Sequence, residues 1–190
     1  MAFWIPVLGL YTGCRLEELA QLLCSDVRQE DGIWYLDLVE GEGKSLKTEA
    51  ATRKVPLHSF IVEQLGFIKH VEQMKEAGNE RIFPELKNHN GKFGHYVSKW
   101  FNERYLLQVG VKTDTSRKVF HSLRHTFITN LQHNRTDPYL MASIVGHEAG
   151  LITISIYGEE YKLDAKRDAI EKLDFGIDLS RLAQSRFVVR

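Results

Sequence analysis

One β-rich window interrupts a chain whose apolar residues otherwise recur at helical spacing. Residues 33–40, IWYLDLVE, are rich in β-branched and aromatic residues and predict a strand. The next stretch, GEGKSLKTEAATRKVPLH, indicates a turn, a short strand, a second turn and another strand. The sequence therefore predicts a mainly α-helical fold with a small three-stranded antiparallel sheet at one edge, an α+β architecture.

Helical periodicity covers most of the remaining chain. Along the stretch 92–108, the apolar side is expected to hold Phe93, Tyr96, Val97, Trp100 and Phe101. The segment that follows Phe175 is interpreted as a loosely attached tail. The predicted helices are residues 2–11, 14–27, 59–76, 92–108, 117–132, 137–146 and 162–173.

Composition narrows the class of protein. A chain of 190 residues that is 43% hydrophobic can bury one sizeable core, and no apolar run reaches the 18 residues typical of a membrane span. The apolar opening, MAFWIPVLGLYTG, lacks the basic region and the cleavage site of a signal peptide, so it predicts a core helix. Cys14 and Cys24 show no zinc-ligand spacing and are expected as buried free thiols, which fits a reducing compartment.

Charge is balanced overall but unevenly distributed. The formal net charge is zero, with 25 basic and 25 acidic residues. Residues 111–147 hold five lysines and arginines against two aspartates, and four of the eight histidines. A neutral molecule can therefore still present a positive face to an anionic partner.

Four motifs contain residues suited to phosphate chemistry. YTGCRLEEL places Arg15 after a glycine break, HSLRH places His121 and Arg124 on one helix face, and IVGHEAGLITISIYG contains His147 and Tyr157, ten residues apart. The fourth is the lysine-bearing hairpin SLKTEAATRKVPL.

Phosphodiester cleavage needs a nucleophile, an acid for the leaving oxygen and charge stabilisation on the phosphate. The planar forks of Arg15 and Arg124 match two phosphate oxygens and stay protonated. Tyr157 can attack phosphorus, and nearby guanidinium groups would favour its phenolate, because the pKa of an ordinary tyrosine is about 10.

Taken in this order, the motifs from Tyr11 to Tyr157 resemble the tyrosine recombinase (phage integrase) family, and GHE…YG and PLH look most like prophage integrases. The resemblance implies the catalytic-domain fold of that family over residues 1–175, with a C-terminal tail at 176–190. Family members usually have an N-terminal DNA-binding domain, which is expected to be absent from this chain. The implied activity is site-specific DNA recombination or integration, in which DNA is cut and rejoined through a 3′-phosphotyrosyl intermediate.

The resemblance also implies individual roles. Lys47 would be the general acid for the 5′ oxygen, His121 and His147 would hydrogen-bond the phosphate or move protons, and Glu18 would orient Arg15. The phosphotyrosine keeps the bond energy, so no nucleotide cofactor is expected, and the arginines replace a metal ion. The implied partners are double-stranded DNA and three further copies of the chain, in a homo-tetramer on two duplexes, with accessory DNA-bending proteins where the target site requires them.

Several assignments leave alternatives open. Lys44 is the second choice for the general acid, Glu18 can instead form a plain intrahelical pair with Arg15, and Tyr161 is a rival nucleophile disfavoured by two adjacent glutamates. Arg53 and Lys54 are interpreted as solvated or as contacts to the DNA backbone. His125 is interpreted as structural. Two other functions share these motifs: a catalytically silent DNA-binding module and a type IB topoisomerase-like activity.

Overall fold

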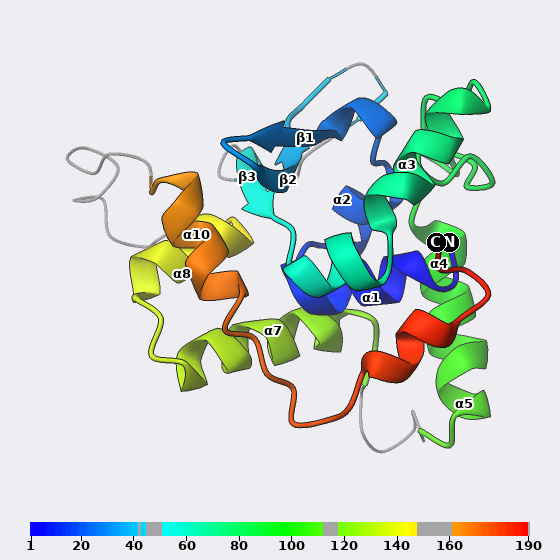
Figure 1. The fold of residues 1–190 in the computed structure, drawn as a ribbon. Helices are drawn as coiled ribbons and strands as arrows, with labels where there is room; N and C mark the ends of the chain where they lie inside the picture. The colour runs from blue at the N-terminus through cyan, green and yellow to red at the C-terminus, as the bar shows by residue number, and fades with distance from the viewer. Residues whose placement is uncertain (42, 45–50, 112–117, 148–160, 190) are drawn as a thin grey trace.

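Helix α1 (Trp4–Thr12) lies in the middle of the computed structural model, below the sheet and against α7 (His121–His133) (Figure 1). The structure describes residues 1–41, 43–44, 51–111, 118–147 and 161–189. Side chains on several sides of α1 are inaccessible, and Ile5 and Leu8 are both 0% exposed. A helix that is apolar all round belongs in a core, so the predicted core helix is confirmed.

The sheet has three antiparallel strands in the order β1–β2–β3, which confirms the predicted fold class. They are β1 (Val27–Glu30), β2 (Ile33–Leu38) and β3 (Arg53–Pro56). Val27 lies opposite Leu36, and Leu38 lies opposite Arg53. Helices α8 (Pro138–Val145) and α10 (Leu163–Ile170) pack against β3. The short strand expected between the two turns of the hairpin lies mostly outside the described residues.

The prediction of a single helix over residues 14–27 is wrong. Only α2 (Leu16–Ala20) is α-helical, followed by a 3₁₀ turn, η1 (Cys24–Asp26), and then by β1. The Asp26 carboxylate accepts a hydrogen bond from the backbone N–H of Leu23 at 2.8 Å, an arrangement that competes with helix continuation.

The remaining expected helices are present with shorter or interrupted bounds. Residues 59–76 divide at Gly66, whose φ is +67°. The run from His95 to Gln108 includes a π-helical stretch, η4. The elements are η3 (Phe60–Gln64, also π-helical), α3 (Phe67–Glu76), α4 (His95–Trp100), η4 (Phe101–Tyr105), α5 (Leu106–Gln108) and the 3₁₀ helix η5 (Ser180–Gln184).

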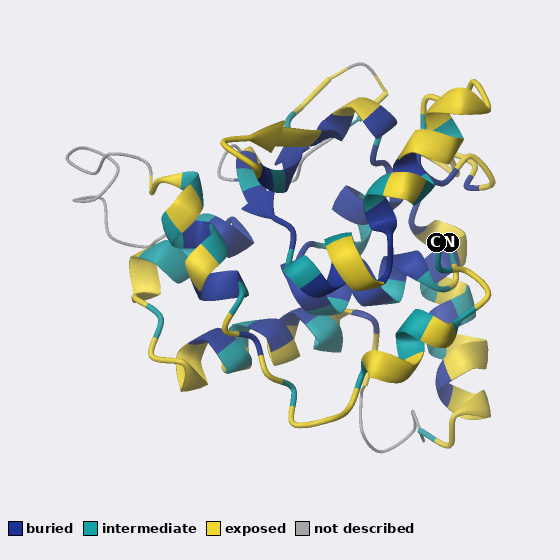
Figure 2. Ribbon diagram, viewed as in Figure 1, coloured by how far each residue is buried: buried dark blue, intermediate teal, exposed yellow. Residues whose placement is uncertain are grey.

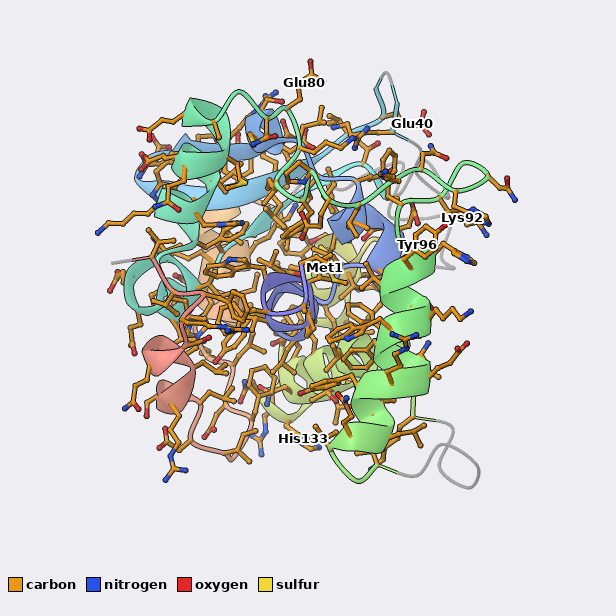
Figure 3. All side chains as sticks on the ribbon, turned by 90° about the vertical axis from the view of Figure 1, so that its right-hand side faces the viewer. Met1, Glu40, Glu80, Lys92, Tyr96 and His133 are labelled. Carbon is orange, nitrogen blue, oxygen red and sulfur yellow. The ribbon has the colours of Figure 1, made fainter. Side chains whose placement is uncertain are left out.

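Tyr96 does not join the buried side of α4. Phe93, Val97 and Phe101 are 8%, 0% and 5% exposed, whereas Tyr96 is 51% exposed. These three residues follow one another at intervals of four, and Tyr96 precedes Val97 by a rotation of about 100° around the axis. Tyr96 therefore lies with Lys92 at the surface, at the N-terminal end of α4 (Figure 3). The outer faces of α3, α4 and α5 are largely exposed (Figure 2).

The C-terminal segment packs on the core, so the expected loose attachment is wrong. The Phe175 ring meets the Tyr11 ring edge-on with centroids 5.1 Å apart, and Phe187 stacks on Phe3 at 5.8 Å. The last described carbonyl, that of Val189, lies against Gly66 where a Cβ atom would collide with it. The C-terminal segment therefore packs beside the start of α1 at Phe3 and beside the start of α3 at Gly66. Among the described residues, no helix has the length and apolar character to cross a membrane.

Candidate active site

A glycine turn between α1 and α2 determines where Arg15 lies. Gly13 ends α1 in the left-handed conformation with φ +63°, and a Cβ atom there would collide with the Phe127 ring. The Thr12 hydroxyl donates to the Leu8 carbonyl at 2.6 Å and accepts from the Cys14 N–H at 3.3 Å. The chain reverses within these few residues, and Arg15 becomes the N-cap of α2. The turn therefore requires the glycine of the Thr-Gly-x-Arg pattern and is stabilised by its threonine.

Glu18 holds Arg15 at two points. One carboxylate oxygen, Oε2, accepts from the Arg15 backbone N–H at 2.8 Å, and Oε1 accepts from Arg15 Nη1 at 2.8 Å. The carboxylate is buried, with Glu18 only 4% exposed. Burial alone would raise the pKa of Glu18, but the charge and hydrogen bonds of Arg53, with those from Arg15, outweigh it and lower the pKa. Glu18 is therefore ionised, and it contacts both the backbone and the guanidinium of Arg15.

Arg124 faces inward from α7 and is 2% exposed. Its Nη1 donates to the Gly13 carbonyl at 2.6 Å, and its Nη2 donates to the Val145 carbonyl at 2.7 Å. Burial, together with the charges of Arg15 and Arg53, lowers the pKa of Arg124 to about 10. Arg124 therefore remains a cation at neutral pH, held among other cations by backbone carbonyls.

The C-terminus of α8 brings His147 to the same place. Asp137 caps the other end of α8, and Gly146 ends the helix with φ +66°. Arg15 Nη2 donates to the Gly146 carbonyl at 3.1 Å, next to His147. Desolvation lowers the pKa of His147, and the charges of Arg124, Arg15, Arg53 and His121 lower it further.

Four of the six expected reaction residues thus come together from three parts of the chain: Arg15 from α2, His121 and Arg124 from α7, and His147 from the end of α8. Because an ordinary histidine has a pKa near 6.5, His147 is neutral at pH 7 and can accept a proton or a hydrogen bond. The imidazole of His125 meets that of His121 edge-on, with centroids 4.9 Å apart. Lys47 and Tyr157, the other two expected reaction residues, lie outside the described residues.

The expectation that Arg53 is solvated is wrong. Its side chain is 2% exposed and bonds Glu18 through Nη2 at 2.9 Å. Arg53 Nη1 donates to the Ala51 carbonyl at 2.7 Å, and Nε donates to the Ile144 carbonyl at 2.8 Å. The physical reason is strand alternation: Arg53 shares a face of β3 with Val55, and that face is turned into the protein. As placed, the Arg53 guanidinium is directed at the protein interior rather than at a DNA backbone.

The other basic residues of the hairpin differ sharply from Arg53. Lys54, the next residue, points outward, is paired with Glu30 at 2.5 Å and has a side chain that is 39% exposed. Lys44, the alternative general acid, forms a buried ion pair with Asp26 at 2.6 Å, and the two side chains are 6% and 5% exposed. The Lys44 ammonium group is therefore bound by Asp26 and shielded from solvent.

Tyr161, the rival nucleophile, is engaged elsewhere. Its hydroxyl donates to Asp137 Oδ1 at 2.7 Å, and that hydrogen bond raises the pKa of Tyr161. Asp137 also accepts from the N–H groups of Tyr139 and Leu140 as the cap of α8. Tyr161 therefore lies at the end of α8 opposite to His147, and its phenol is a poorer nucleophile than an ordinary tyrosine.

Sequence reasoning misplaced one residue that builds the site, Arg53, and missed another, Glu17. Arg53 was detectable in principle, because Val55 and Leu57 alternate with it along an inward-facing pattern. Glu17 gave no such signal: its carboxylate accepts from the N–H groups of Phe93 and Gly94 at 2.6 and 2.9 Å, and these partners are more than 70 residues away. Glu17 therefore fastens the start of α4 to α2, the helix that Arg15 caps.

The sequence of the chain is similar to those of known recombinases. The sequence pattern described as the phage integrase family matches residues 6–163. Tyrosine recombinase XerC of Proteus mirabilis is 31% identical over 145 residues, which are 76% of this chain and 43% of that protein. This chain thus spans less than half the length of that relative.

Two solved structures show the same fold. The integrase of mycobacterium phage Brujita superposes with a TM-score of 0.60 at 20% identity, over 98% of this chain and 56% of the other. A XerH site-specific recombinase, solved with its difH substrate as a pre-cleavage complex, gives a TM-score of 0.52 at 28% identity, over 83% of this chain and 42% of the other.

Proposed function

The chain belongs to the phage integrase family, and from this premise we propose that it cuts and rejoins double-stranded DNA at a defined site. The single observation that carries the proposal is the convergence of two guanidinium groups on adjacent carbonyls. Arg124 Nη2 and Arg15 Nη2 donate to Val145 and Gly146 at 2.7 and 3.1 Å, directly before His147. Cations held together in this way repel one another, and a bound phosphodiester would relieve that repulsion.

Each arginine has N–H groups to spare for a ligand. A guanidinium carries five donors, and the two hydrogen bonds described for Arg124 go to Gly13 and Val145. The remaining edge of the fork suits the non-bridging oxygens of a phosphodiester. The stabilisation grows as negative charge develops on those oxygens in the transition state.

The proposed chemistry is a reversible phosphoryl transfer. The Tyr157 phenol loses its proton and attacks phosphorus, the bond from phosphorus to the 5′ oxygen breaks, and Lys47 supplies a proton to that leaving oxygen. The product is a 3′-phosphotyrosyl bond and a free 5′ hydroxyl. Attack by the 5′ hydroxyl of another strand then forms the new phosphodiester and releases Tyr157. His121 and His147 are proposed to bond the phosphate or move protons, and Glu18 is proposed to hold Arg15 in place.

The proposed assembly follows from this chemistry. Exchange between two duplexes requires four strand cleavages, so we propose a homo-tetramer on two duplexes, with accessory DNA-bending proteins at target sites that need them. The substrate would be reached in the bacterial nucleoid, and Lys54 remains the proposed contact to the DNA backbone. The matched region is 43% of the length of the Proteus mirabilis recombinase, and we propose that the described domain in isolation binds DNA weakly and recombines poorly.

A trapped covalent adduct tests the proposal. A nicked duplex with the cognate site, from which the cleaved end is lost, is incubated with the protein fused to a DNA-clamping domain and run on a denaturing gel. Wild type and Tyr161→Phe should give the shifted protein–DNA band, and Tyr157→Phe should give none, because it lacks only the attacking oxygen.

Three results would redirect the proposal. An adduct formed by Tyr157→Phe would show that the nucleophile is another residue. DNA binding without any adduct in wild type would favour a catalytically silent DNA-binding module. Relaxation of supercoiled plasmid without a site requirement would indicate a type IB topoisomerase-like activity.

A further inference from the structure

Three arginines dock on three successive carbonyls at the C-terminus of α8. Arg53 Nε donates to Ile144 at 2.8 Å, Arg124 Nη2 donates to Val145 at 2.7 Å, and Arg15 Nη2 donates to Gly146 at 3.1 Å. The last carbonyls of a helix have no partner within it and carry a partial negative charge. The end of α8 therefore gathers three cations and offsets part of their mutual repulsion.

Arg53 differs from the other two arginines because it is enclosed by protein. Its side chain is 2% exposed, against 23% for the Arg15 side chain. Arg53 Nη1 and Nη2 approach the two Glu18 oxygens at 3.3 and 2.9 Å, and Nη1 also donates to the Ala51 carbonyl at 2.7 Å. One guanidinium thus joins β3, α2 and α8, the elements on which the candidate active site is built.

We propose that Arg53 is a positioning residue for strand cleavage: it fixes the Glu18 carboxylate, and through it the phosphate-binding guanidinium of Arg15, against the end of α8. The inference rests on the proposed function, because it assigns Arg53 a task in that reaction. Arg53 acts without touching DNA. Loss of the Arg53 fork removes two of the hydrogen bonds that hold the Glu18 carboxylate, and with them part of the support of the Arg15 guanidinium.

Lysine cannot replace Arg53 in this role. An ammonium group is a point charge on a flexible stem, whereas the Arg53 fork bonds Glu18, Ala51 and Ile144 in three directions at once. Arg53→Lys keeps the positive charge beside Glu18 but loses the planar geometry. This substitution therefore separates positioning from charge.

The test compares Arg53→Lys with Arg28→Lys under single-turnover conditions. Arg28 is a matched control on the same sheet, since it pairs with Asp37 at 2.9 Å through a side chain that is 54% exposed. Arg53→Lys should slow adduct formation about 100-fold, the scale of loss expected from a misplacement of about 1 Å, while the Kd for DNA stays within about threefold. Arg28→Lys should retain the wild-type rate. A wild-type rate for Arg53→Lys would overturn the inference.

The salt dependence of DNA binding separates positioning from direct contact. Because Arg53 makes no phosphate contact in this proposal, Arg53→Lys and Arg53→Met should both keep the wild-type slope of log Kd against log salt. Lys54→Met should weaken binding and reduce the slope by about one phosphate contact. A reduced slope for Arg53→Met, with the rate at saturating DNA unchanged, would make Arg53 a DNA contact and contradict the inference.

Coupling to Glu18 tests the route through which Arg53 acts. If Arg53 acts through Glu18, the rate losses of Arg53→Lys and Glu18→Gln should combine to much less than their product, because both remove the same support for Arg15. Fully multiplicative losses would contradict that route. This cycle needs only the two conservative variants, so it stands even where Arg53→Met does not fold.

Binding of inorganic phosphate tests positioning without any chemistry. The imidazole signal of His147 in NMR spectra reports phosphate at the cluster, and Arg53→Lys should need about tenfold more phosphate than wild type or Arg28→Lys for the same response. A phosphate response with no covalent adduct in wild type would remove the proposed function and leave the positioning role intact. Equal responses in wild type and Arg53→Lys, or none in wild type, would overturn the positioning role.

Discussion

The side-chain oxygen of Asn102 accepts a hydrogen bond from the backbone N–H of Phe120 at 2.9 Å, one residue before α7 begins at His121. Asn102 lies in the π-helical stretch η4, and such stretches often occur at functional positions. Glu17 fastens the start of α4 to α2 by accepting from Gly94 at 2.9 Å. The helical run from α4 to α5 is thus tied at one point to the helix of Arg15 and at another to the helix of His121 and Arg124.

Loss of the Asn102 acceptor should loosen the start of α7. Asn102→Ala leaves the Phe120 N–H without its partner, and we expect the free energy of unfolding to fall by about 1–3 kcal/mol. The rate of strand cleavage should fall by more than the loss of folded protein explains, because His121 follows Phe120 directly in the chain. Chemical denaturation and single-turnover cleavage measure the two effects.

Two matched variants control this prediction. Asn102→Asp keeps the accepting oxygen and should stay close to wild type in both measurements. Ser98→Ala removes only the hydroxyl that accepts from Asn102 Nδ2 at 3.1 Å and should cost little. Equal losses in Asn102→Asp and Asn102→Ala would show that the bond to Phe120 is unimportant.

Gly13 should be among the least tolerant positions of the chain. Its φ is +63°, and a Cβ atom would collide with the Phe127 ring. We expect Gly13→Ala to lower the free energy of unfolding by about 2–4 kcal/mol, from left-handed strain plus overpacking. Gly32→Ala is the control: its φ is +79° and nothing lies within 4 Å of the added Cβ, so only about 1 kcal/mol of strain applies. Similar losses at both positions would contradict the steric contribution of Phe127.

His70 should make the protein less stable in acid. Its ring stacks on Trp4 with centroids 5.3 Å apart, and in the described part of the chain its buried Nε2 has no hydrogen-bond partner. Burial lowers the pKa of His70 below its ordinary value, so the folded state binds fewer protons than the unfolded state as pH falls through about 6.5. The free energy of unfolding should therefore decrease from about pH 7.5 to about pH 5.

His70→Phe removes this titration and retains an aromatic ring beside Trp4. Urea unfolding at both pH values should show a smaller acid-induced loss than in wild type. An unchanged loss would assign the pH dependence to other groups.

The fold class could be predicted from the sequence, but the boundaries of the helices and strands could be predicted less well. Leucine spacing suggested one helix through Val27, yet the chain turns into β1 and returns through Asp31 and Gly32, which have φ of +49° and +79°. Two successive positive φ values are typical of a two-residue hairpin turn, and Asp-Gly is its usual sequence. The local turn signal was present and outweighed the helical period.

The candidate site could likewise be predicted only in part from the sequence. A family resemblance indicated that the motifs around Arg15, His121, Arg124 and His147 form one centre. No local sequence pattern can show that residues more than 100 positions apart lie close together in space. The burial of Arg53 depends on Glu18 and on the Ile144 carbonyl, which no sequence window around it contains. Long-range carbonyl acceptors have no signature in side-chain sequence, and the docking of the arginines on α8 therefore required the structure.

The two hairpin lysines should separate stability from chemistry. Lys44→Met leaves the buried Asp26 carboxylate without its cation, and we expect the free energy of unfolding to fall by about 3 kcal/mol or more. Lys47→Met removes the proposed general acid and should slow strand cleavage by about 10²- to 10⁴-fold, with a much smaller effect on unfolding. Chemical denaturation and adduct formation, measured on both variants, distinguish the two roles.

A sulfur-bridged substrate decides which lysine protonates the leaving oxygen. When sulfur replaces the 5′ bridging oxygen, the leaving thiolate needs no proton, since the pKa of a thiol is only about 8.5. Lys47→Met should therefore cleave the sulfur-bridged duplex at a rate near that of wild type, although it barely cleaves the normal one. Lys44→Met, where it is folded, should show no such selective recovery, because its defect lies in the fold. Recovery in Lys44→Met and not in Lys47→Met would exchange the two assignments and make the buried pair with Asp26 the source of the proton.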